Sequence, residues 1–283
     1  MTFELASHRF QFSARDRISF PAGNAGNVLR GWFGHALRKA APAQYERIFE
    51  PGAAGRGPSG LANWPRPFVF RARHLNGLTV EAGERFWFGV NVFDLRTPLI
   101  VYFEAAFAHL ASVGMGPLRG RAELMGVETA EAVSVPLGPG AEGVHRIRVE
   151  FRSPTELKGG DAELTGQPDF AVLFGRARDR VSTLRALYGA GPLDIDFRSI
   201  GERASAVRMT RSELTHVQAY RRSSRSGLVH PLGGFVGVAE YEGALSEFLP
   251  HLEAAHWTGV GRQCVWGKGE IVTRRLDGYS TER

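Results

Sequence analysis

The chain has 283 residues, of which 43% are hydrophobic and 23% charged, a composition that excludes a disordered protein. Its formal net charge is +6, and most of its basic residues are arginines, since lysine occurs only as Lys39, Lys158 and Lys268. Guanidinium groups bind phosphate in a bidentate manner and stack on bases, which favours a nucleic-acid partner. A genome rich in G and C would also favour arginine codons, and composition does not separate the two explanations.

The single cysteine, Cys264, excludes an internal disulfide and a cysteine-based zinc site, and it fits a reducing cytosol. The first twenty residues carry several charged side chains and no apolar stretch of the signal-peptide type. The most apolar helix candidate, residues 99–113, is interrupted by Glu104 and His109 and is too short for a bilayer. We therefore expect a cytoplasmic protein with no membrane partner and no metal site.

The first half of the chain predicts a strand, a helix, a hairpin, a helix and a strand. Apolar residues alternate over residues 3–20, as in a strand, and a Pro- and Gly-containing turn precedes an amphipathic helix over 28–40. Residues 44–67 are rich in Pro and Gly and are expected to be irregular. The remaining expected elements are strands over 68–73 and 85–94 that pair as a hairpin, a helix over 99–113 and a strand over 121–130.

The Gly- and Pro-rich segment 136–143 is the expected linker, and the same plan restarts after it. The expected elements of the second half are a strand over 145–152, a helix over 170–188, strands over 195–207, 215–222 and 234–241, a helix over 245–255 and a strand over 265–272. Two copies of this order predict an α+β protein of two tandem ferredoxin-like (βαββαβ, RRM-like) domains, over residues 1–137 and 144–283. Because this fold hosts many functions, function has to be argued from individual residues.

The segment Thr258–Gly269 combines four glycines with Arg262, Trp266 and Lys268. Glycine lets a backbone approach a ligand closely, and cations beside an aromatic ring suit a phosphodiester chain, particularly single-stranded or looped RNA. The alternative is a glycine-rich turn between a helix and the last strand, with no ligand.

Three segments resemble a known family. Val28–Arg38 resembles the first-helix signature of CRISPR-associated precursor-RNA processing endoribonucleases of the RAMP superfamily. Phe151–Lys158 resembles the opening strand of their second domain, and Gly233–Gly237, followed by the loop 258–269, resembles their C-terminal signature. The order and spacing of the three motifs carry the resemblance, which spans about residues 18–272.

The resemblance implies an endoribonuclease that needs no metal or other cofactor and that cuts CRISPR repeat RNA once per repeat. The 2′-hydroxyl beside the scissile phosphate attacks, which leaves a 2′,3′-cyclic phosphate and a 5′-hydroxyl, and the guide RNA passes to a CRISPR interference complex. Some relatives carry cysteine pairs after the first helix, and this chain has none there. Whether the protein is a monomer or a homodimer is left open.

This reaction needs a base, an acid and a cation that neutralises the phosphorane. His35 is the first candidate, because histidine titrates near neutrality and helical spacing places it on a polar face with Gly31 and Lys39. Family members often use a histidine in or just after this helix, and tyrosine partners it in several relatives, which makes Tyr45 the second candidate. Arg38 and Lys39 are the candidate cations. Each of these residues could instead be structural, as a solvated histidine, a packed tyrosine or cations at a helix end.

Further RNA contacts are expected from a basic hairpin after Tyr220, since relatives insert such a hairpin against the RNA stem; in general a charged hairpin is more often only solvated. The candidate RNA-binding residues are Arg221, Arg222, Arg225 and His230 on this hairpin, Arg30 in the first helix, and Gly259, Gly261, Arg262, Trp266 and Lys268 in the glycine loop. Arg262 and Lys268 are expected to contact phosphates.

Two other functions fit the same residues. A non-catalytic RNA-binding subunit of a CRISPR effector complex, built on the same two domains, would need no histidine that faces the RNA. A ferredoxin-like module with no nucleic-acid role would be basic for compositional reasons alone, and it would show no RNA affinity that weakens steeply with salt.

Overall fold

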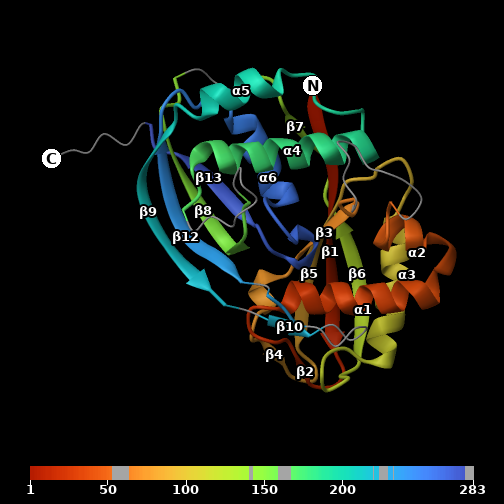
Figure 1. Ribbon diagram of the computed structural model, residues 1–283. Coiled ribbons are helices and arrows are strands. Elements are labelled where there is room, and N and C mark those ends of the chain that lie inside the picture. The colour runs from red at the N-terminus through yellow and green to blue at the C-terminus, as the bar shows by residue number, and fades with distance from the viewer. Residues whose placement is uncertain are drawn as a thin grey trace.

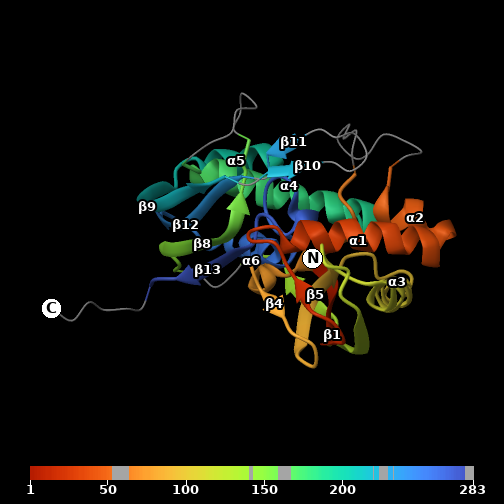
Figure 2. The same ribbon diagram turned by 90° about the horizontal axis from the view of Figure 1, so that it is seen from below.

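The computed structural model describes residues 1–52, 64–139, 143–158, 167–218, 220–222, 229–231 and 233–277. It contains two main antiparallel sheets, each with helices packed on one face (Figure 1). Figure 2 gives the same arrangement seen from below.

The first sheet has the strand order β3-β5-β1-β6. Its strands are β1 (Thr2–Ala14), β3 (Phe68–Arg71), β5 (Arg85–Val92) and β6 (Ala122–Thr129), and β7 (Val133–Pro136) pairs with the start of β1. All of these neighbours are antiparallel.

Strand β1 contributes to two hydrophobic cores through opposite faces. Phe10 and Phe12 are buried under the helices of the first sheet, whereas Phe3 and Leu5 are buried in a different cluster that includes residues of the C-terminal half. Successive strand residues point to opposite faces, so the even-numbered pair and the odd-numbered pair face opposite ways. One strand therefore ties both halves of the chain together.

Helices α1 (Ala25–Ala40) and α3 (Ile100–Val113) cover one face of the first sheet through stacked aromatic rings. Phe33 on α1 stacks on Phe103 and Phe107 on α3, with ring centroids 4.2 and 5.3 Å apart. Such contacts add to the free energy gained by burial alone. Two small elements complete this half, the pair β2 (Ile18–Ser19) with β4 (Thr79–Val80) and the 3-10 helix η2 (Arg73–Leu75).

Helix α2 (Pro42–Phe49) corrects the prediction that residues 44–67 are irregular throughout. Pro42 begins this helix, where its fixed φ suits the first turn and its missing N–H has no helical partner to lose. Ile48 and Phe49 are buried and hold the helix against α1. The prediction is therefore wrong over residues 44–49.

The second sheet has the order β13-β8-β12-β9. Its strands are β8 (Arg146–Thr155), β9 (Arg208–Val217), β12 (Gly234–Glu242) and β13 (Ile271–Arg275), with α4 (Phe170–Tyr188) and α6 (Leu249–Thr258) on one face. A short ribbon, β10 (Tyr220–Arg222) with β11 (Val229–Pro231), lies between β9 and β12 in the chain. The last predicted strand begins later than expected, because the 3-10 helix η3 (Cys264–Trp266) precedes β13.

Helix α5 (Phe197–Ala204) corrects the predicted strand over residues 195–207. Asp196 caps it, because its Oδ1 accepts hydrogen bonds from the backbone N–H groups of Arg198 and Ser199, both at 3.0 Å. A side-chain cap of this kind stabilises a helix by about 1 kcal/mol. Ile200 and Ala204, four residues apart, form the buried side.

The predicted fold class is confirmed. In chain order the main elements read β1-α1-β3-β5-α3-β6 and then β8-α4-β9-β12-α6-β13, and both sheets place their first and third strands in the centre. The predicted boundary at residues 137–144 stays a proposal; it falls between β7 and β8. Within the described ranges, no helix combines the length and the apolar character needed to cross a membrane.

The two halves meet through a shared apolar cluster and through the end of α6. Phe3, Val69 and Phe93 of the first half pack in one cluster with Leu184 and Tyr188 of the second. The end of α6 is held by side chains of both halves: Arg71 Nη2 donates to the carbonyls of His256 and Trp257 at 2.8 Å, Asn91 Nδ2 to the Trp257 carbonyl at 2.9 Å, and Arg180 Nε to the Thr258 carbonyl at 3.0 Å. These carbonyls have no partner inside the helix, so the side chains satisfy them.

Burial lowers the pKa of His251 to about 4, with a smaller contribution from Arg178. Below about pH 6.5 the unfolded chain therefore binds a proton that the folded chain does not bind, and each unit of pKa difference corresponds to about 1.4 kcal/mol. We expect the free energy of unfolding, from urea titrations, to fall as the pH decreases from about 6.5 toward 4. The fall should be smaller in His251→Leu.

Some pH dependence should remain in that variant, because burial also lowers the pKa of His8. His145 is exposed, and the control His145→Gln should keep the wild-type profile. Equal pH profiles for His251→Leu and the wild type would contradict the assignment.

Candidate active site

Helix α1 buries one side and presents a polar edge to solvent. Leu29 and Phe33 are fully buried, whereas Gly31, His35 and Lys39 are exposed. This placement agrees with the helical spacing in the sequence. The His35 ring is thus accessible to a ligand, and its catalytic role stays a prediction.

Three glycines of α1 have different surroundings. A Cβ on Gly26 would lie 2.8 Å from the Trp266 carbonyl oxygen, and one on Gly34 would lie 2.3 Å from Phe49 Cζ. Glycine at these two positions lets the glycine loop and α2 pack directly on the helix backbone. A Cβ on Gly31 would meet nothing within 4 Å, so Gly31 leaves bare backbone at the surface, one turn from the exposed His35.

Tyr45 and Arg38 are in contact, as their candidate roles require. The Arg38 guanidinium carbon lies 4.5 Å from the centroid of the Tyr45 ring, which is a cation–π distance. The Tyr45 hydroxyl donates a hydrogen bond to Glu50 Oε1 at 3.2 Å. Burial, and after it Glu50, raises the pKa of Tyr45. Tyr45 is therefore a neutral phenol near pH 7, which can donate a hydrogen bond or a proton but does not serve as a base.

Arg30 links α1 to the glycine loop. Its guanidinium carbon lies 4.5 Å from the Phe49 ring centroid and 5.6 Å from that of Trp266. Arg66 lies over the same Phe49 ring at 5.0 Å, and its Nε donates to the Phe49 carbonyl. Two cations and two aromatic rings thus occupy the junction of α1, α2 and the loop.

The glycine loop is fastened to the end of β8 by its backbone. The N–H of Arg262 donates to the Glu156 carbonyl at 3.0 Å, and the N–H of Gly269 donates to the Pro154 carbonyl at 3.1 Å. Gly261 has a φ of +82°, and a Cβ there would lie 2.4 Å from the Glu156 carbonyl oxygen. Gly259 also has a positive φ, of +75°. Both glycines are needed for the path of the loop, and a ligand contact at either stays a prediction.

Glu156, which the sequence analysis did not single out, is the centre of the polar contacts in this loop. Its carboxylate is 8% exposed and accepts hydrogen bonds from Arg262 and from Lys268 Nζ, the latter at 3.0 Å. Lys268 Nζ also donates to the Gly233 carbonyl at 2.7 Å and to Gln263 Oε1 at 2.9 Å.

These contacts change the role that we assign to Lys268. Its side chain is 5% exposed, and burial lowers its pKa. Three protein acceptors surround the ammonium group, so Lys268 supports the loop from within, and a phosphate contact by it stays a prediction. The Arg262 side chain is 48% exposed and keeps an edge toward solvent.

A hollow of about 770 Å³ lies beside the loop, next to α4. Basic side chains from separate segments line it together with Trp266: Arg66, Lys158, Arg180 and Arg262. The sequence analysis did not select the first three of these, because no common motif links residues that meet only after folding. In the described part of the chain, no three His, Cys, Asp or Glu side chains converge as a metal site would require.

The basic hairpin is described only in part. In the β10–β11 pair, Arg221 is opposite His230 and Arg222 is opposite Val229. The pair continues from β9 and β12, at the end of the second sheet that points toward α1 in Figure 1. Arg225 lies outside the described residues. RNA contacts by this hairpin stay a prediction.

Two family models match the chain, one in each half. Residues 149–271 match the model described as CRISPR-associated endoribonuclease Cas6, and residues 3–138 match a model described as an N-terminal domain. No curated protein matches the sequence.

Solved structures similar to this chain share its fold at low sequence identity. A Cas6 product complex has a TM-score of 0.65 at 16% identity, and the match covers 96% of this chain and 100% of that chain. A second structure of the same Cas6 is described as that of Thermus thermophilus. A second Cas6 product complex has a TM-score of 0.59 at 18% identity, with 96% and 99% covered. A RAMP protein described as binding different RNA substrates has a TM-score of 0.53 at 8% identity, with 95% and 100% covered.

Replacing Glu156 with alanine should strongly destabilise the protein, because it leaves the buried Lys268 ammonium without its counter-charge. Removing one partner of a buried ion pair typically costs about 3–5 kcal/mol. We expect a loss of this order in the free energy of unfolding, measured by urea denaturation.

The matched control is Glu253→Ala. Glu253 is 52% exposed and pairs with Arg275 at 3.8 Å, and an exposed pair of this kind contributes at most about 1 kcal/mol. A Glu156→Ala variant as stable as this control would show that Glu156 does not hold the loop.

Proposed function

We propose a family, a reaction and its residues for this chain, whose residues 149–271 match the model described as CRISPR-associated endoribonuclease Cas6 and whose fold is shared by a RAMP protein. We infer that the chain is an endoribonuclease of CRISPR RNA processing. We infer that it cuts repeat RNA without a metal ion, by attack of the 2′-hydroxyl on the adjacent phosphate. The products are then a 2′,3′-cyclic phosphate and a 5′-hydroxyl.

One observation carries this proposal: an exposed histidine lies on the polar edge of α1, one turn from an arginine that packs on a tyrosine. His35 supplies the imidazole, and Arg38 and Lys39 are exposed beside it. Cations placed where negative charge develops stabilise the transition state of phosphoryl transfer. A histidine that served only to solubilise the helix would not need exposed cations and a packed tyrosine next to it.

The residues divide the chemistry according to their protonation states. His35 takes the proton of the 2′-hydroxyl, because histidine near neutral pH can accept a proton and return it. Tyr45, held as a neutral phenol by burial and by Glu50, donates its proton to the leaving 5′-oxygen, which departs as the 5′-hydroxyl. Arg38 lies on the Tyr45 ring and so brings its charge to the same place.

The RNA chain beyond the cut has a basic path next to this edge. Arg30 and Trp266 join α1 to the hollow that Arg66, Arg180 and Arg262 line. Arginine forks contact phosphates, and the Trp266 ring offers a face for a base. The buried residues Lys268 and Glu156 hold the glycine loop in position and thereby position the loop residues of this path.

We also propose the partners of the reaction. Relatives described as product and substrate-mimic complexes support CRISPR repeat RNA as the bound partner. A structure described as a Cas6-RT-Cas1–Cas2 complex supports assembly with other CRISPR proteins. Transfer of the guide RNA to an interference complex and a cytoplasmic location are further parts of the proposal, and the choice between a monomer and a homodimer stays open.

His35→Ala should lower the rate of repeat cleavage by about 10²–10⁴, the span typical of a general acid–base residue, while repeat binding persists. The measurement is single-turnover cleavage of end-labelled repeat RNA in EDTA, with analysis of the product ends. The matched control is His145→Ala, an exposed histidine on the other half of the chain, which should cleave at the wild-type rate.

Unchanged cleavage by His35→Ala would remove this residue from the site. Tight binding of intact RNA by the wild type would instead identify the protein as a non-catalytic RNA-binding subunit. Cleavage that stops in EDTA and returns with a divalent ion would overturn the metal-free mechanism.

Gly31→Ala should raise stability and impair cleavage. The new methyl group has room in the folded protein, and alanine is favoured over glycine within a helix by about 1 kcal/mol. If the RNA backbone approaches α1 beside His35, the same methyl group obstructs it, so we expect a higher melting temperature together with weaker repeat binding. Gly34→Ala is the contrasting variant, since its methyl group would collide with Phe49 and lower the melting temperature. Full repeat affinity in a stabilised Gly31→Ala protein would place the RNA elsewhere.

A further inference from the structure

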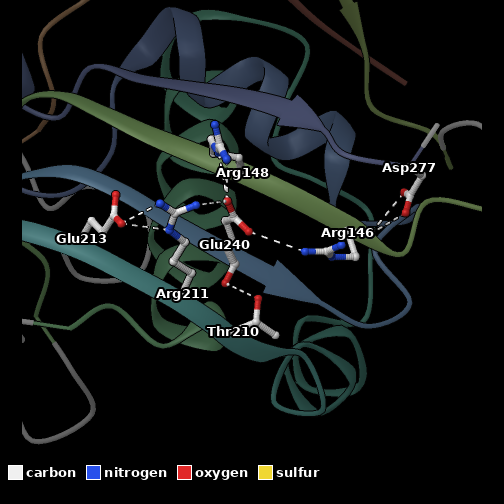
Figure 3. Close-up of polar contacts among 7 residues, drawn as sticks. All are labelled: Arg146, Arg148, Thr210, Arg211, Glu213, Glu240 and Asp277. Carbon is white, nitrogen blue, oxygen red and sulfur yellow. Dashed lines mark hydrogen bonds and ion pairs between the residues drawn. The ribbon is translucent and has the colours of Figure 1, made fainter. Parts of the chain in front are cut away.

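Among the residues that the structure describes, helices cover only one face of the second sheet, and arginines dominate one end of the other face. Ile147 and Val149 of β8 point into the core with α4 and α6, so the residues between them point to the opposite side. Arg146 and Arg148 are on this open face, and Arg211 of β9 is opposite Glu240 of β12 in the strand register. Figure 3 shows these side chains gathered over the sheet.

Glu240 lies at the centre of this group. Its Oε1 lies 2.7 Å from Arg148 Nη2 and 3.5 Å from Arg211 Nη1, and its Oε2 lies 3.6 Å from Arg146 Nη2. The Glu240 side chain is 8% exposed, whereas those of the three arginines are 37–51% exposed. The carboxylate therefore lies beneath the guanidinium groups, orients them and reduces their mutual repulsion, while positive charge faces the solvent.

Two more arginines border the same place. Arg274 of β13 joins the three others around an open hollow of about 490 Å³, and Glu240 is the one carboxylate among the described residues that line it. Arg275 also borders the hollow, but it is opposite the core residue Ile147 and pairs with Glu253 of α6, so its side chain lies toward the helices. Two arginines that line the hollow also pair with acidic side chains outside it, Arg211 with Glu213 and Arg274 with Glu150. Arg148 donates hydrogen bonds to Glu240 from Nε and Nη2. Because a guanidinium group carries five N–H donors, the Nη1 edge of Arg148 can donate to another acceptor.

We propose that this arginine array (Arg146, Arg148, Arg211 and Arg274) binds the phosphodiester backbone of single-stranded RNA that flanks the repeat. This inference rests on the proposed function, because it takes the substrate to be a transcript longer than the segment in the active site. The array lies on the face of the second sheet opposite α4, whereas the glycine-loop hollow lies next to α4. The two surfaces are therefore separate, and the flank passes over the sheet.

Two physical arguments select RNA as the occupant. Exposed guanidinium groups bind phosphates in fixed forks, and the one carboxylate lining the hollow is buried beneath them, so an anionic backbone meets positive charge first. A flank that is covalently joined to the bound repeat is also present at a high effective concentration. The tethered flank would therefore bind the array even if each phosphate contact is weak by itself. A free anion at low concentration would leave the array largely unbound.

The test compares two RNAs: the repeat alone, and the repeat with single-stranded extensions of unrelated sequence on both sides. Binding of each is measured as a function of salt for the wild type and for Arg148→Gln/Arg274→Gln. For the extended RNA, the slope of log affinity against log salt should decrease by about 0.7 per lost phosphate contact, thus by about 1.4 for the double variant. For the repeat alone, the slope should not change.

The matched control is Arg15→Gln/Arg198→Gln. These two arginines are also ion-paired and exposed, by 64% and 89%, but they lie outside the array. The proposal would be overturned if the slope of log affinity against log salt decreased no more in the array variant than in this control. It would also be overturned if the slope decreased equally for both RNAs. If the double variant unfolds, Arg274→Gln alone on β13 replaces it, with an expected decrease of about 0.7 for the extended RNA.

The outcome is independent of the cleavage assay. Wild-type protein that binds both RNAs but cleaves neither would refute the proposed reaction, and the comparison of slopes would still decide whether the array holds the flank. Wild-type cleavage with identical slopes for the array variant would refute the array alone.

Discussion

The capping of helix α6 by side chains from both halves of the molecule is the contact on which the candidate site depends. The carbonyls of His256, Trp257 and Thr258 end the helix and need donors, and cations are favoured at this end of a helix. Arg71 comes from the first sheet and Arg180 from the second half, so the loop that follows is fixed relative to both. The shared apolar cluster around Phe3 and Leu184 makes the same junction rigid from the other side.

That junction brings α1 and the glycine loop into direct contact. Gly26 lets the Trp266 carbonyl approach the helix backbone, and Arg30 packs over the Trp266 ring. The loop itself is held from within by Glu156 and Lys268, two charges that are costly to bury and that compensate each other only in good geometry. A buried ion pair of this kind specifies one position for the loop, and this position also sets where the exposed Arg262 and the half-buried Trp266 lie.

Sequence reasoning worked where one local pattern governs the outcome. Residues 170–188 carry a helical period of apolar residues, and α4 covers Phe170–Tyr188. The predicted strand over residues 195–207 is wrong, because Asp196 caps a helix there and the helical pair Ile200 and Ala204 forms its buried side. Sequence reasoning also does not reveal the ion pair of Lys268. The partner that buries this lysine, Glu156, is 112 residues away in the chain, and no local signal connects the two.

By itself, the sequence determined the order of strands and helices, the basic character of the surface and the exposure of His35, since each follows from composition or from the period of one segment. The tertiary structure decided which charged side chains face solvent and which are paired with other residues of the protein. It buried Lys268, placed Arg38 on Tyr45, gathered Arg66, Lys158 and Arg180 beside the loop, and set arginines of three strands around Glu240. The physical reason is that hydrogen bonding and desolvation depend on distances between residues far apart in the chain, which only the packing of two sheets and their helices establishes.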